Sequence, residues 1–278
     1  MLYIVPTPIG NLGDITARAL EVLGQVDLIA AEDTRNTLKL LSHFNIRKKV
    51  ISYFEHNKVT RGQEILSYLL DGKNIAVVSD AGMPGISDPG ADIIKLAVAN
   101  NIEVSVLPGA CAGVTALVAS ALPTDKFVFE GFIGTDNKKI TAFLQMIQKE
   151  TRTVIIYEAP HRVLKTLALL KENIGSRKIA VCRELTKIHE EIYRGTADEA
   201  ISFFTEKPPR GEFVIVIEGA LEACCEKNEM SDAEIYNCVN ELRQEGMGRS
   251  DALKAVALRC GKSRNDVYAI CEKIKKGY

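Results

Sequence analysis

The sequence predicts an α/β protein of two domains followed by a small helical module. Short apolar segments alternate with segments of helical periodicity from the N-terminus to residue 217, a pattern typical of helices packed against mostly parallel sheets. At 278 residues the chain is also longer than one small core organises. Beyond Gly219 the apolar segments stop and short helical patterns follow. We therefore expect α/β domains over residues 1–115 and 116–222 and a helical module over 223–278.

The first domain starts with an apolar strand that runs into a proline-rich segment. Asn11 or Asp14 is positioned to cap the helix that follows this segment. Gly72 is positioned to close a later helix. Because the strands are short and apolar throughout, they suit a sheet that is buried on both faces. The expected strands are 2–5, 28–31, 49–53, 75–78 and 103–107, and the expected helices are 15–23, 34–44, 61–71 and 91–99.

The second domain repeats the pattern after a helix of small residues that Pro123 interrupts. The segment that joins the two halves lies near residues 113–123. Two α/β halves joined in this way leave a cleft between them, and ligands bind preferentially in such clefts. The expected strands are 127–132, 153–157, 179–182 and 211–217, and the expected helices are 112–121, 138–149 and 163–173.

The C-terminal module begins after a polar linker at 222–230. Ser231 and Glu234 form a capping-box pattern at the start of a helix that extends to Gln244. A second helix is expected from Ser250 to Cys260, and Ser263 is positioned to cap a third. Short helices joined by glycine-containing turns resemble a helix-turn-helix unit.

Charge is unevenly distributed along the chain, although the formal net charge is only −1. Residues 243–278 contain nine Lys or Arg and four Asp or Glu. A basic tail on an acidic body suggests a polyanionic partner such as a nucleic acid, and a solvated helical face explains the same charges equally well.

Two further patterns bear on compartment and metal binding. The seven cysteines include no C-x-x-C pair, so the sequence predicts reduced thiols and no metal site. No apolar run reaches the ~18 residues that a membrane span needs, and the N-terminus lacks a signal pattern. A cytoplasmic protein without membrane contact is expected.

The segment Ser79–Gly90 is the strongest functional signal in the sequence. It reads Ser-Asp-Ala-Gly-Met-Pro-Gly-Ile-Ser-Asp-Pro-Gly and joins an apolar strand to a helix. Most strand-to-helix connections span 2–6 residues, so a long loop rich in glycine and proline is better explained as a ligand cradle. Further loops after strands occur at 6–13 and 108–113.

The nature of the ligand follows partly from what these loops lack. Neither G-x-G-x-x-G nor G-x-x-x-x-G-K-[ST] is present, which argues against a standard dinucleotide or triphosphate site. The loop at 108–113 opens onto a helix whose amides favour an anion such as a carboxylate. A ligand with a carboxylate and an adenosine but no phosphate would suit these loops, and S-adenosylmethionine is one.

Several long motifs resemble the tetrapyrrole methylase superfamily, in particular its branch that acts on ribosomal RNA. The resemblance implies two αβα domains with S-adenosylmethionine in the cleft between them, usually in a homodimer. It also implies 2′-O-methylation of a cytidine ribose in the decoding region of the 16S rRNA of the small ribosomal subunit. The motifs are Tyr3–Asp14, Ala31–Arg35, Ser79–Gly90, Leu107–Gly109, Tyr157–Arg162 and Arg183–Lys187.

By this resemblance the cofactor borders a defined set of positions. The first loop departs from the G-x-G-x-G pattern of the superfamily's tetrapyrrole enzymes, since it reads Pro6-Thr-Pro-Ile-Gly10. This departure fits the ribosomal branch and counts against a porphyrin or corrin substrate. The expected cofactor-binding residues are Pro8, Ile9, Gly10, Asp80, Ala81, Gly82, Gly85, Ile86, Cys111, Ala112, Tyr157, Glu158 and Leu185.

The acceptor hydroxyl is a weak nucleophile, so a base or hydrogen-bond acceptor near it is expected. The candidate catalytic residues are Glu32, Asp33, Arg35, His56, Glu184 and Lys187. Arg35 and Arg162 also suit phosphate because the guanidinium group is a planar fork. Structural ion pairs and helix caps explain any one of these residues as well. The expected substrate-binding residues are Arg162, Lys262, Arg264 and Lys273, whereas His43 and His189 are interpreted as structural or surface residues.

Two other functions remain open from the sequence. One is a methyltransferase that acts on a small molecule of the tetrapyrrole type or on a protein, for which the basic C-terminal helices would have no use. The other is a non-catalytic ribosome-assembly factor, which the intact glycine-rich loops disfavour.

Overall fold

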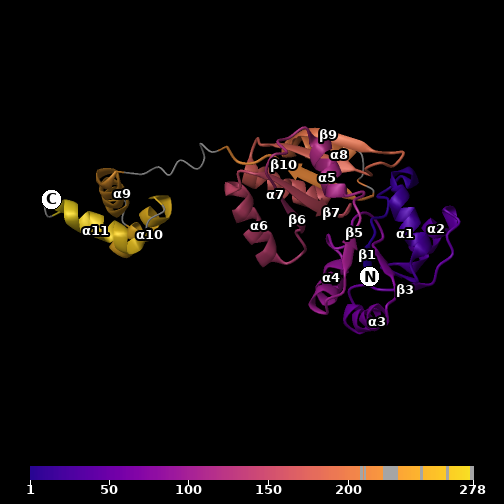
Figure 1. Cartoon of the computed structure of the whole chain (residues 1–278). Coiled ribbons are helices and arrows are strands. Elements are labelled where there is room, and N and C mark those ends of the chain that lie inside the picture. Colours follow the sequence, from indigo (N-terminus) through magenta and orange to yellow (C-terminus); the bar gives the residue numbers. More distant parts are fainter. Residues whose placement is uncertain (207–208, 210, 222–230, 245–246, 261–262, 276–278) are drawn as a thin grey trace. The chain divides into compact units, whose positions relative to one another are not determined.

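The computed structural model describes residues 1–206, 209, 211–221, 231–244, 247–260 and 263–275. The chain divides into two compact units, Met1–Ala220 and Leu221–Tyr278. Within the described residues, the first unit holds two five-stranded sheets with helices (Figure 1), and the second unit is helical. The predicted α/β class with a helical C-terminal module is confirmed.

The first sheet is parallel throughout, with strand order β3-β2-β4-β1-β5. Leu2 in β1 aligns with Ile75 of β4 on one side and with Val104 of β5 on the other. As a result, the loops that follow β1 and β4 leave the same edge of the sheet next to each other. The strands are β1 (Leu2–Ile4), β2 (Leu28–Ala31), β3 (Val50–Ser52), β4 (Ile75–Val78) and β5 (Val104–Val106).

Helices cover both faces of this sheet. Alternate side chains of each strand point to opposite faces, and because these side chains are apolar, both faces must be buried. Leu2 and Ile4 pack with α3 (Lys58–Leu70) and α4 (Gly90–Ala99). The intervening and following residues, Tyr3 and Val5, join a core on the other face with α1 (Ala17–Gln25) and α2 (Thr34–His43).

The cap of α1 differs from the sequence prediction. The side chain of Thr16 caps α1 by accepting a hydrogen bond from the N–H of Ala19 at 3.1 Å. Asn11 instead caps the short 3₁₀ helix η1 (Leu12–Asp14), where its side chain accepts from the N–H of Gly13 at 2.9 Å. Asn11 therefore caps the 3₁₀ helix and Thr16 caps α1, the helix that follows it.

The second sheet is mixed, with strand order β6-β7-β10-β8-β9. Among its described strands, only β6 and β7 pair in parallel; β10 runs antiparallel to both β7 and β8, and β9 is antiparallel to β8. The sequence pattern predicted mostly parallel strands and missed β9 and α8. The reason is that β9 is a half-buried edge strand with polar residues rather than an apolar run. The elements are α5 (Ala112–Ser120), β6 (Phe127–Phe132), α6 (Asn137–Lys149), β7 (Thr153–Glu158), α7 (Val163–Ile174), β8 (Lys178–Arg183), β9 (Glu191–Thr196), α8 (Ala197–Glu206) and β10 (Phe213–Ile217).

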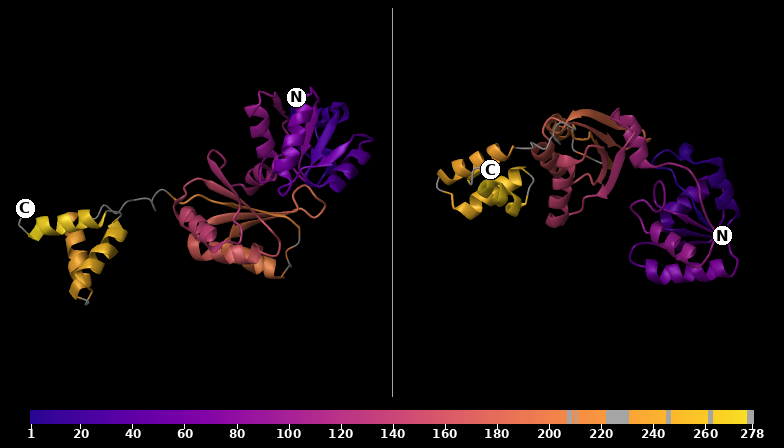
Figure 2. Two further views of the ribbon diagram at one scale, coloured as in Figure 1. Left: turned by 90° about the horizontal axis from the view of Figure 1, so that it is seen from below. Right: turned by 60° about the vertical axis from the view of Figure 1, so that its left-hand side comes forward.

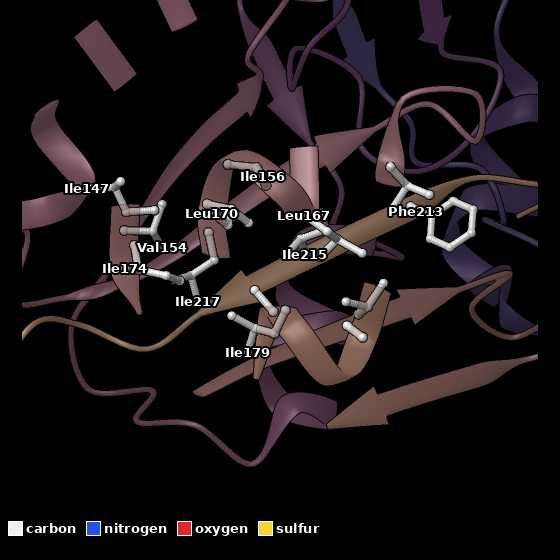
Figure 3. Close-up of a cluster of buried hydrophobic side chains, with 14 of the residues drawn as sticks. Ile147, Val154, Ile156, Leu167, Leu170, Ile174, Ile179, Phe213, Ile215 and Ile217 are labelled. Atoms are coloured by element: carbon white, nitrogen blue, oxygen red, sulfur yellow. The ribbon is translucent and has the colours of Figure 1, made fainter. Parts of the chain in front are cut away.

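The larger core of this domain lies between the sheet and helices α6, α7 and α8. Ile147 and Leu167 from α6 and α7 are fully buried there (Figure 3). Phe204 from α8 is fully buried in the same core. Helix α5 covers the opposite face, where Ala116 and Leu117 form a second cluster with β7, β8 and β10. Two further views distinguish the indigo-to-magenta first domain from the rose-to-orange second domain (Figure 2).

The C-terminal unit packs α9 (Asp232–Gln244), α10 (Arg249–Cys260) and α11 (Arg264–Lys275) on one core. Ile235, Val256 and Val267 are fully buried in it. The predicted capping box is present, since the Ser231 hydroxyl accepts from the N–H of Glu234 and the Glu234 carboxylate accepts from the N–H of Ser231. Ser263 accepts from the N–H of Asp266 at 3.1 Å and so caps α11 as predicted.

Among the described residues, no helix combines the length and the apolar character that crossing a membrane requires.

Candidate functional site

The loops after β1 and β4 are joined directly at the carboxyl edge of the first sheet. Thr7 and Gly82 exchange two backbone hydrogen bonds of 3.0 Å each. The Thr7 hydroxyl also donates to the carbonyl of Ser79 at 3.1 Å. Gly82 has φ of +81°, which favours glycine. In open α/β sheets ligands bind at this edge, at the point where the chain connections diverge.

The rest of the glycine-rich loop is a tight turn organised by Asp88. Its Oδ1 accepts from the N–H of Gly85 at 2.7 Å and from the N–H of Gly90 at 2.8 Å. A Cβ at Gly90 would lie 2.6 Å from the nitrogen of Gly85, so the turn requires glycine there. The long loop predicted as a ligand cradle is therefore an ordered structure held by its own carboxylate.

A cleft of about 450 Å³ opens between the two sheets. Its walls come from the β1 and β4 loops, the start of α5, the end of β7, the segment after β8 and the start of β10. Ten of the thirteen expected cofactor-binding residues line it: Ile9, Asp80, Ala81, Gly82, Ile86, Cys111, Ala112, Tyr157, Glu158 and Leu185. Residues that line it beyond this set include Ser79, Met83, Ser87, Asp88, Phe132, Ala159, Pro160, Glu212, Phe213 and Val214.

Other expected site residues lie outside this cleft. Pro8 and Gly10 line a second cavity, and Gly85 is part of the turn around Asp88. Among the catalytic candidates Glu32, Glu184 and Lys187 line the main cleft, whereas Asp33, Arg35 and His56 do not. His56 is an exposed residue in the turn that follows β3. Of the C-terminal candidates, Arg264 and Lys273 are exposed on α11, and Lys262 lies outside the described residues.

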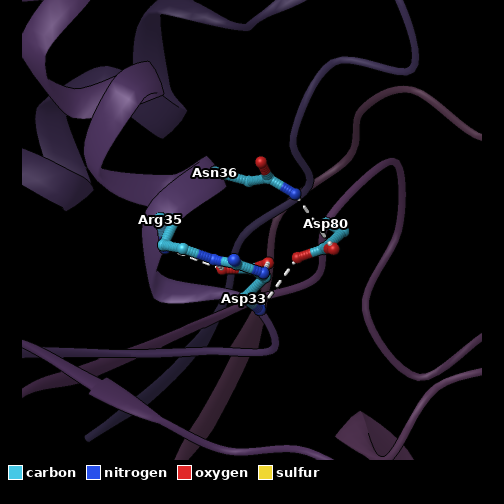
Figure 4. A network of polar contacts seen from close by, with 4 residues as sticks. All are labelled: Asp33, Arg35, Asn36 and Asp80. Carbon is cyan, nitrogen blue, oxygen red and sulfur yellow. Dashed lines mark hydrogen bonds and ion pairs between the residues drawn. The ribbon is translucent and has the colours of Figure 1, made fainter.

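Asp80 connects the cleft to the start of α2 (Figure 4). Its Oδ1 accepts from the N–H of Asp33 at 2.9 Å and its Oδ2 accepts from the side-chain amide of Asn36 at 3.2 Å. The carboxylate of Asp80 is thus held in place by two donors from one helix end.

Asp33 and Arg35 form a local cap on α2. Asp33 accepts from the N–H and the Nε of Arg35 at 2.8 and 3.0 Å, and Arg35 Nη2 lies 2.6 Å from Asp33 Oδ2. These hydrogen bonds from Arg35 lower the pKa of Asp33 to about 2. A carboxylate that holds its charge so firmly is a poor proton acceptor, so capping explains this pair without a catalytic role.

Two other carboxyl groups in the cleft have the opposite character. Burial raises the pKa of Glu32, and the neighbouring charge of Asp80 adds to the effect. Burial also raises the pKa of Asp88, despite the amide hydrogen bonds that it accepts. A cation bound in the cleft would relieve both groups, because it favours their ionised forms.

The segment after β8 closes the cleft toward the first domain. Glu184 and Thr186 adopt φ of +52° and +63°, which is unusual for residues with side chains and above all for a β-branched one. The Thr186 hydroxyl accepts from the N–H of Asn11 at 3.1 Å. Gly10 lies so close that a Cβ there would be 2.8 Å from the carbonyl oxygen of Leu185. Strained backbone of this kind concentrates at functional sites.

Within this segment Glu184 and Lys187 form an ion pair inside the cleft. Lys187 Nζ donates to Glu184 Oε1 at 2.8 Å, and the N–H of Glu212 donates to the same oxygen at 3.3 Å. Burial opposes ionisation of Glu184, but these hydrogen bonds outweigh it and lower its pKa. The pair supplies a carboxylate and a cation side by side.

Tyr157 and Glu158 end β7 at the opposite wall. The Tyr157 hydroxyl accepts from the N–H of Gly113 at 3.0 Å, and burial raises the pKa of Tyr157 to about 12. Glu158 is buried and accepts from the Thr166 hydroxyl at 2.6 Å. Arg162 lies with Nε 3.7 Å from Glu158 and donates to the carbonyl of Gly134, so its guanidinium supports this wall from outside the cleft.

A second cavity of about 330 Å³ lies beside α2 and shares Ser79 and Asp80 with the main cleft. His43 lines it, although the sequence pattern suggested only a structural or surface role. Lys39 and His43 stand four residues apart and so lie on one face of α2, which is the signal that could have identified them. The lining residues are Thr7, Pro8, Gly10, Leu12, Asn36, Thr37, Lys39, Leu40, His43, Ser79 and Asp80.

In the part of the chain that the structure describes, no group of three or more His, Cys, Asp or Glu side chains is arranged to hold a metal ion.

Comparisons with known proteins agree with this architecture. The family model for tetrapyrrole (corrin/porphyrin) methylases matches residues 1–201. A solved structure of diphthine synthase superposes with a TM-score of 0.61 and 12% identity over 78% of this chain and 89% of that chain, which supports the fold.

Two curated relatives extend the similarity over nearly the full length. A Synechocystis protein named ribosomal RNA small subunit methyltransferase I is 49% identical and covers 97% of this chain and 96% of its own. The protein of the same name from Halalkalibacterium halodurans is 44% identical over 97% of this chain and 93% of its own. The chain therefore belongs to the tetrapyrrole methylase family, and within it to the group of the ribosomal RNA small subunit methyltransferase I proteins.

Proposed function

We propose that this protein is an S-adenosylmethionine-dependent methyltransferase that modifies the 2′-hydroxyl of a cytidine ribose in the decoding region of 16S rRNA. The observation that carries the proposal is the extent of similarity to the rRNA methyltransferase relatives. It covers 97% of the chain and so continues past residue 201, where the general family match ends, into the C-terminal helices. A ribosomal substrate places the activity in the cytoplasm, and family resemblance suggests a homodimer.

The main cleft fits S-adenosylmethionine by the chemistry of its walls. Glu32, Asp80 and Asp88 surround the cleft with carboxyl groups that suit a cationic ligand. Ile9, Leu185 and Val214 supply apolar surface for an adenosine. Gly82 brings backbone close to the ligand without a side chain. When bound there, the cofactor supplies a methyl group on a sulfonium that is its own leaving group.

The chain's own task is then to position the acceptor hydroxyl and to accept its proton. Alignment of the reacting atoms at about 3–3.5 Å supplies much of the acceleration in such a displacement. We assign proton acceptance to Glu32, which lines the cleft. The Glu184–Lys187 pair, whose carboxylate has a lowered pKa, is assigned to positioning the acceptor by hydrogen bonds. Glu32 is suited as a base because its raised pKa brings it closer to neutrality.

The direct test is methyl transfer from labelled S-adenosylmethionine to undermethylated small ribosomal subunits, with the product nucleoside identified by mass. Naked rRNA and a porphyrinogen serve as parallel acceptors. We expect 2′-O-methylcytidine in rRNA. Label that enters the porphyrinogen or protein instead would overturn the assignment of the acceptor.

Cofactor affinity is expected to increase as the pH rises above 4.5, which is the ordinary pKa of a glutamate side chain such as Glu32. In the free protein the raised pKa values keep Glu32 and Asp88 protonated to higher pH than usual, and only their ionised forms attract a cation. The folded state binds these protons more tightly than the unfolded state, so ionisation lowers stability as the pH rises through the folded pKa values. Calorimetry across this range measures the trend. Glu32→Gln should reduce the dependence of cofactor affinity on pH. Equal affinities across the range in the wild type would contradict the role of these carboxyl groups.

Deleting residues 230–278 is expected to weaken rRNA binding about tenfold, as the loss of phosphate contacts implies, and to leave cofactor affinity unchanged. Every residue that lines the cleft belongs to Met1–Ala220. A full-length Arg264→Glu/Lys273→Glu variant tests the same idea with the unit present, because both side chains are exposed. Filter binding measures RNA affinity and calorimetry measures cofactor affinity. Full methylation efficiency in the truncated protein would remove the RNA-binding role of this unit.

A further inference from the structure

We propose that the second cavity, beside α2, receives the target nucleotide of the RNA, with Lys39 and His43 binding its phosphate. The inference rests on the proposed function and deepens it, because it assigns the acceptor to a particular set of residues. Lys39 and His43 line the second cavity and do not line the main cleft.

Position is the first argument. The second cavity and the main cleft, where we place the cofactor, share Ser79 and Asp80 among their lining residues. They also meet at Gly10, which lines the second cavity and lies against Leu185 and Lys187, which line the cleft. Methyl transfer requires the acceptor within about 3–3.5 Å of the donor. Because Ser79 and Asp80 border both cavities, a nucleotide held in the second cavity can extend its ribose past these residues to the methyl donor in the main cleft.

The chemistry of the cavity is the second argument. Pro8, Leu12 and Leu40 provide apolar surface on which a base can lie. Asn36 donates its amide to Asp80 at 3.2 Å and keeps its amide oxygen as an acceptor, which suits the exocyclic amine of a cytosine. A volume of about 330 Å³ falls in the range of small-ligand sites.

Charge is the third argument. Lys39 and His43 are exposed and lie on one face of α2, where they can contact a phosphate at the mouth of the cavity. Asp80 is the one carboxylate among the described residues that line the cavity, and Asp33 and Asn36 already hold both of its oxygens. The rim therefore presents the Lys39 ammonium group and the His43 ring as hydrogen-bond donors to a phosphate, and no carboxylate other than Asp80 lines this cavity among the described residues.

The decisive experiment compares Lys39→Gln, His43→Gln and Lys165→Gln in the full chain. Lys165 is an exposed lysine on α7 that lines neither cavity, so it controls for the loss of one positive charge. For each variant we would measure kcat/KM on undermethylated subunits at several salt concentrations and the S-adenosylmethionine Kd by calorimetry. Leu12→Trp, at a position 39% exposed, should block the cavity without disturbing a core.

We expect Lys39→Gln and His43→Gln each to lower kcat/KM about tenfold, as the loss of one phosphate contact predicts. Lys39→Gln should also reduce the salt slope by about one, because it removes a cation. Cofactor Kd should stay within twofold, and Lys165→Gln should match the wild type. Leu12→Trp should abolish transfer with cofactor bound. Wild-type kcat/KM and salt slope in both cavity variants would overturn the inference while the proposed function stands. A wild-type protein that binds cofactor but does not methylate rRNA would overturn the proposed function, and this inference with it.

Discussion

Gly82→Val is expected to weaken S-adenosylmethionine binding by at least about 100-fold, the loss that ~3 kcal/mol of strain and displacement implies. Gly82 has φ of +81°, where a β-branched residue is strained. A Cβ there would lie 3.2 Å from Ile9 Cγ2 and 3.4 Å from the carbonyl oxygen of Ala110. Ile9 lines the cleft and Ala110 directly precedes Cys111, which also lines it, so relief of these contacts moves the walls of the cleft. The Thr7–Gly82 backbone pair that joins the two loops would also shift.

Gly72→Val is the matched control for this prediction. Gly72 lies at the end of α3 and has the same φ of +81°, but a Cβ at this position would meet no atom of the described residues within 4 Å. Its variant should lose comparable stability and keep cofactor affinity. Calorimetry measures binding, and thermal unfolding measures stability. If Gly82→Val bound cofactor with an affinity within about threefold of the wild type, the loop that contains Gly82 would not be part of the cofactor site.

Gly10→Ala is expected to lower methyl transfer by at least about 100-fold, because reaction geometry tolerates displacements of only about 1 Å. Gly10 does not adopt a positive φ, so its backbone permits a side chain and only the close approach of the Leu185–Lys187 segment forbids one. The carbonyl oxygen of Leu185 would lie 2.8 Å from the new Cβ. Backbone must move, and it carries Glu184 and Lys187 with it.

Gly24→Ala provides the control, because no described atom lies within 4 Å of a Cβ at that position in α1. Alanine favours a helix by about 1 kcal/mol over glycine, so this variant should be fully active and slightly more stable. Single-turnover methylation of small subunits measures the transfer step. Normal transfer by Gly10→Ala would show that the segment after β8 takes no part in positioning the reacting groups.

The sequence predicted the parts of this protein that local patterns control. The expected strands at 28–31 and 75–78 were correct, and that at 2–5 coincides with β1 to within a residue, because buried parallel strands are short and apolar. Ser231 and Ser263 were recognised as caps because a helix end needs an acceptor within three residues. The length and the glycine content of Ser79–Gly90 predicted a ligand cradle, and the structure shows an ordered loop there at the edge of the first sheet.

Other features depend on contacts between segments far apart in the chain, and only the tertiary structure decided them. The hydrogen bond between Asn11 and Thr186 joins residues 175 positions apart, and no local pattern records it. The close approach of the same segment, residues 185–187, explains why Gly10 must lack a side chain. The edge strand β9 escaped prediction because half-buried polar residues carry little periodic signal.

The roles of the charged residues divide along the same line. The sequence by itself determined the family, the α/β class and most of the residues that line the main cleft, since long motifs and strand periodicity are local properties. The tertiary structure decided that Asp80 is held by the N-terminal end of α2, that Arg162 supports a wall from outside, and that Lys39 and His43 line a second cavity. The physical reason is that the pairing of a charge and its position relative to a cleft depend on which elements the fold brings together.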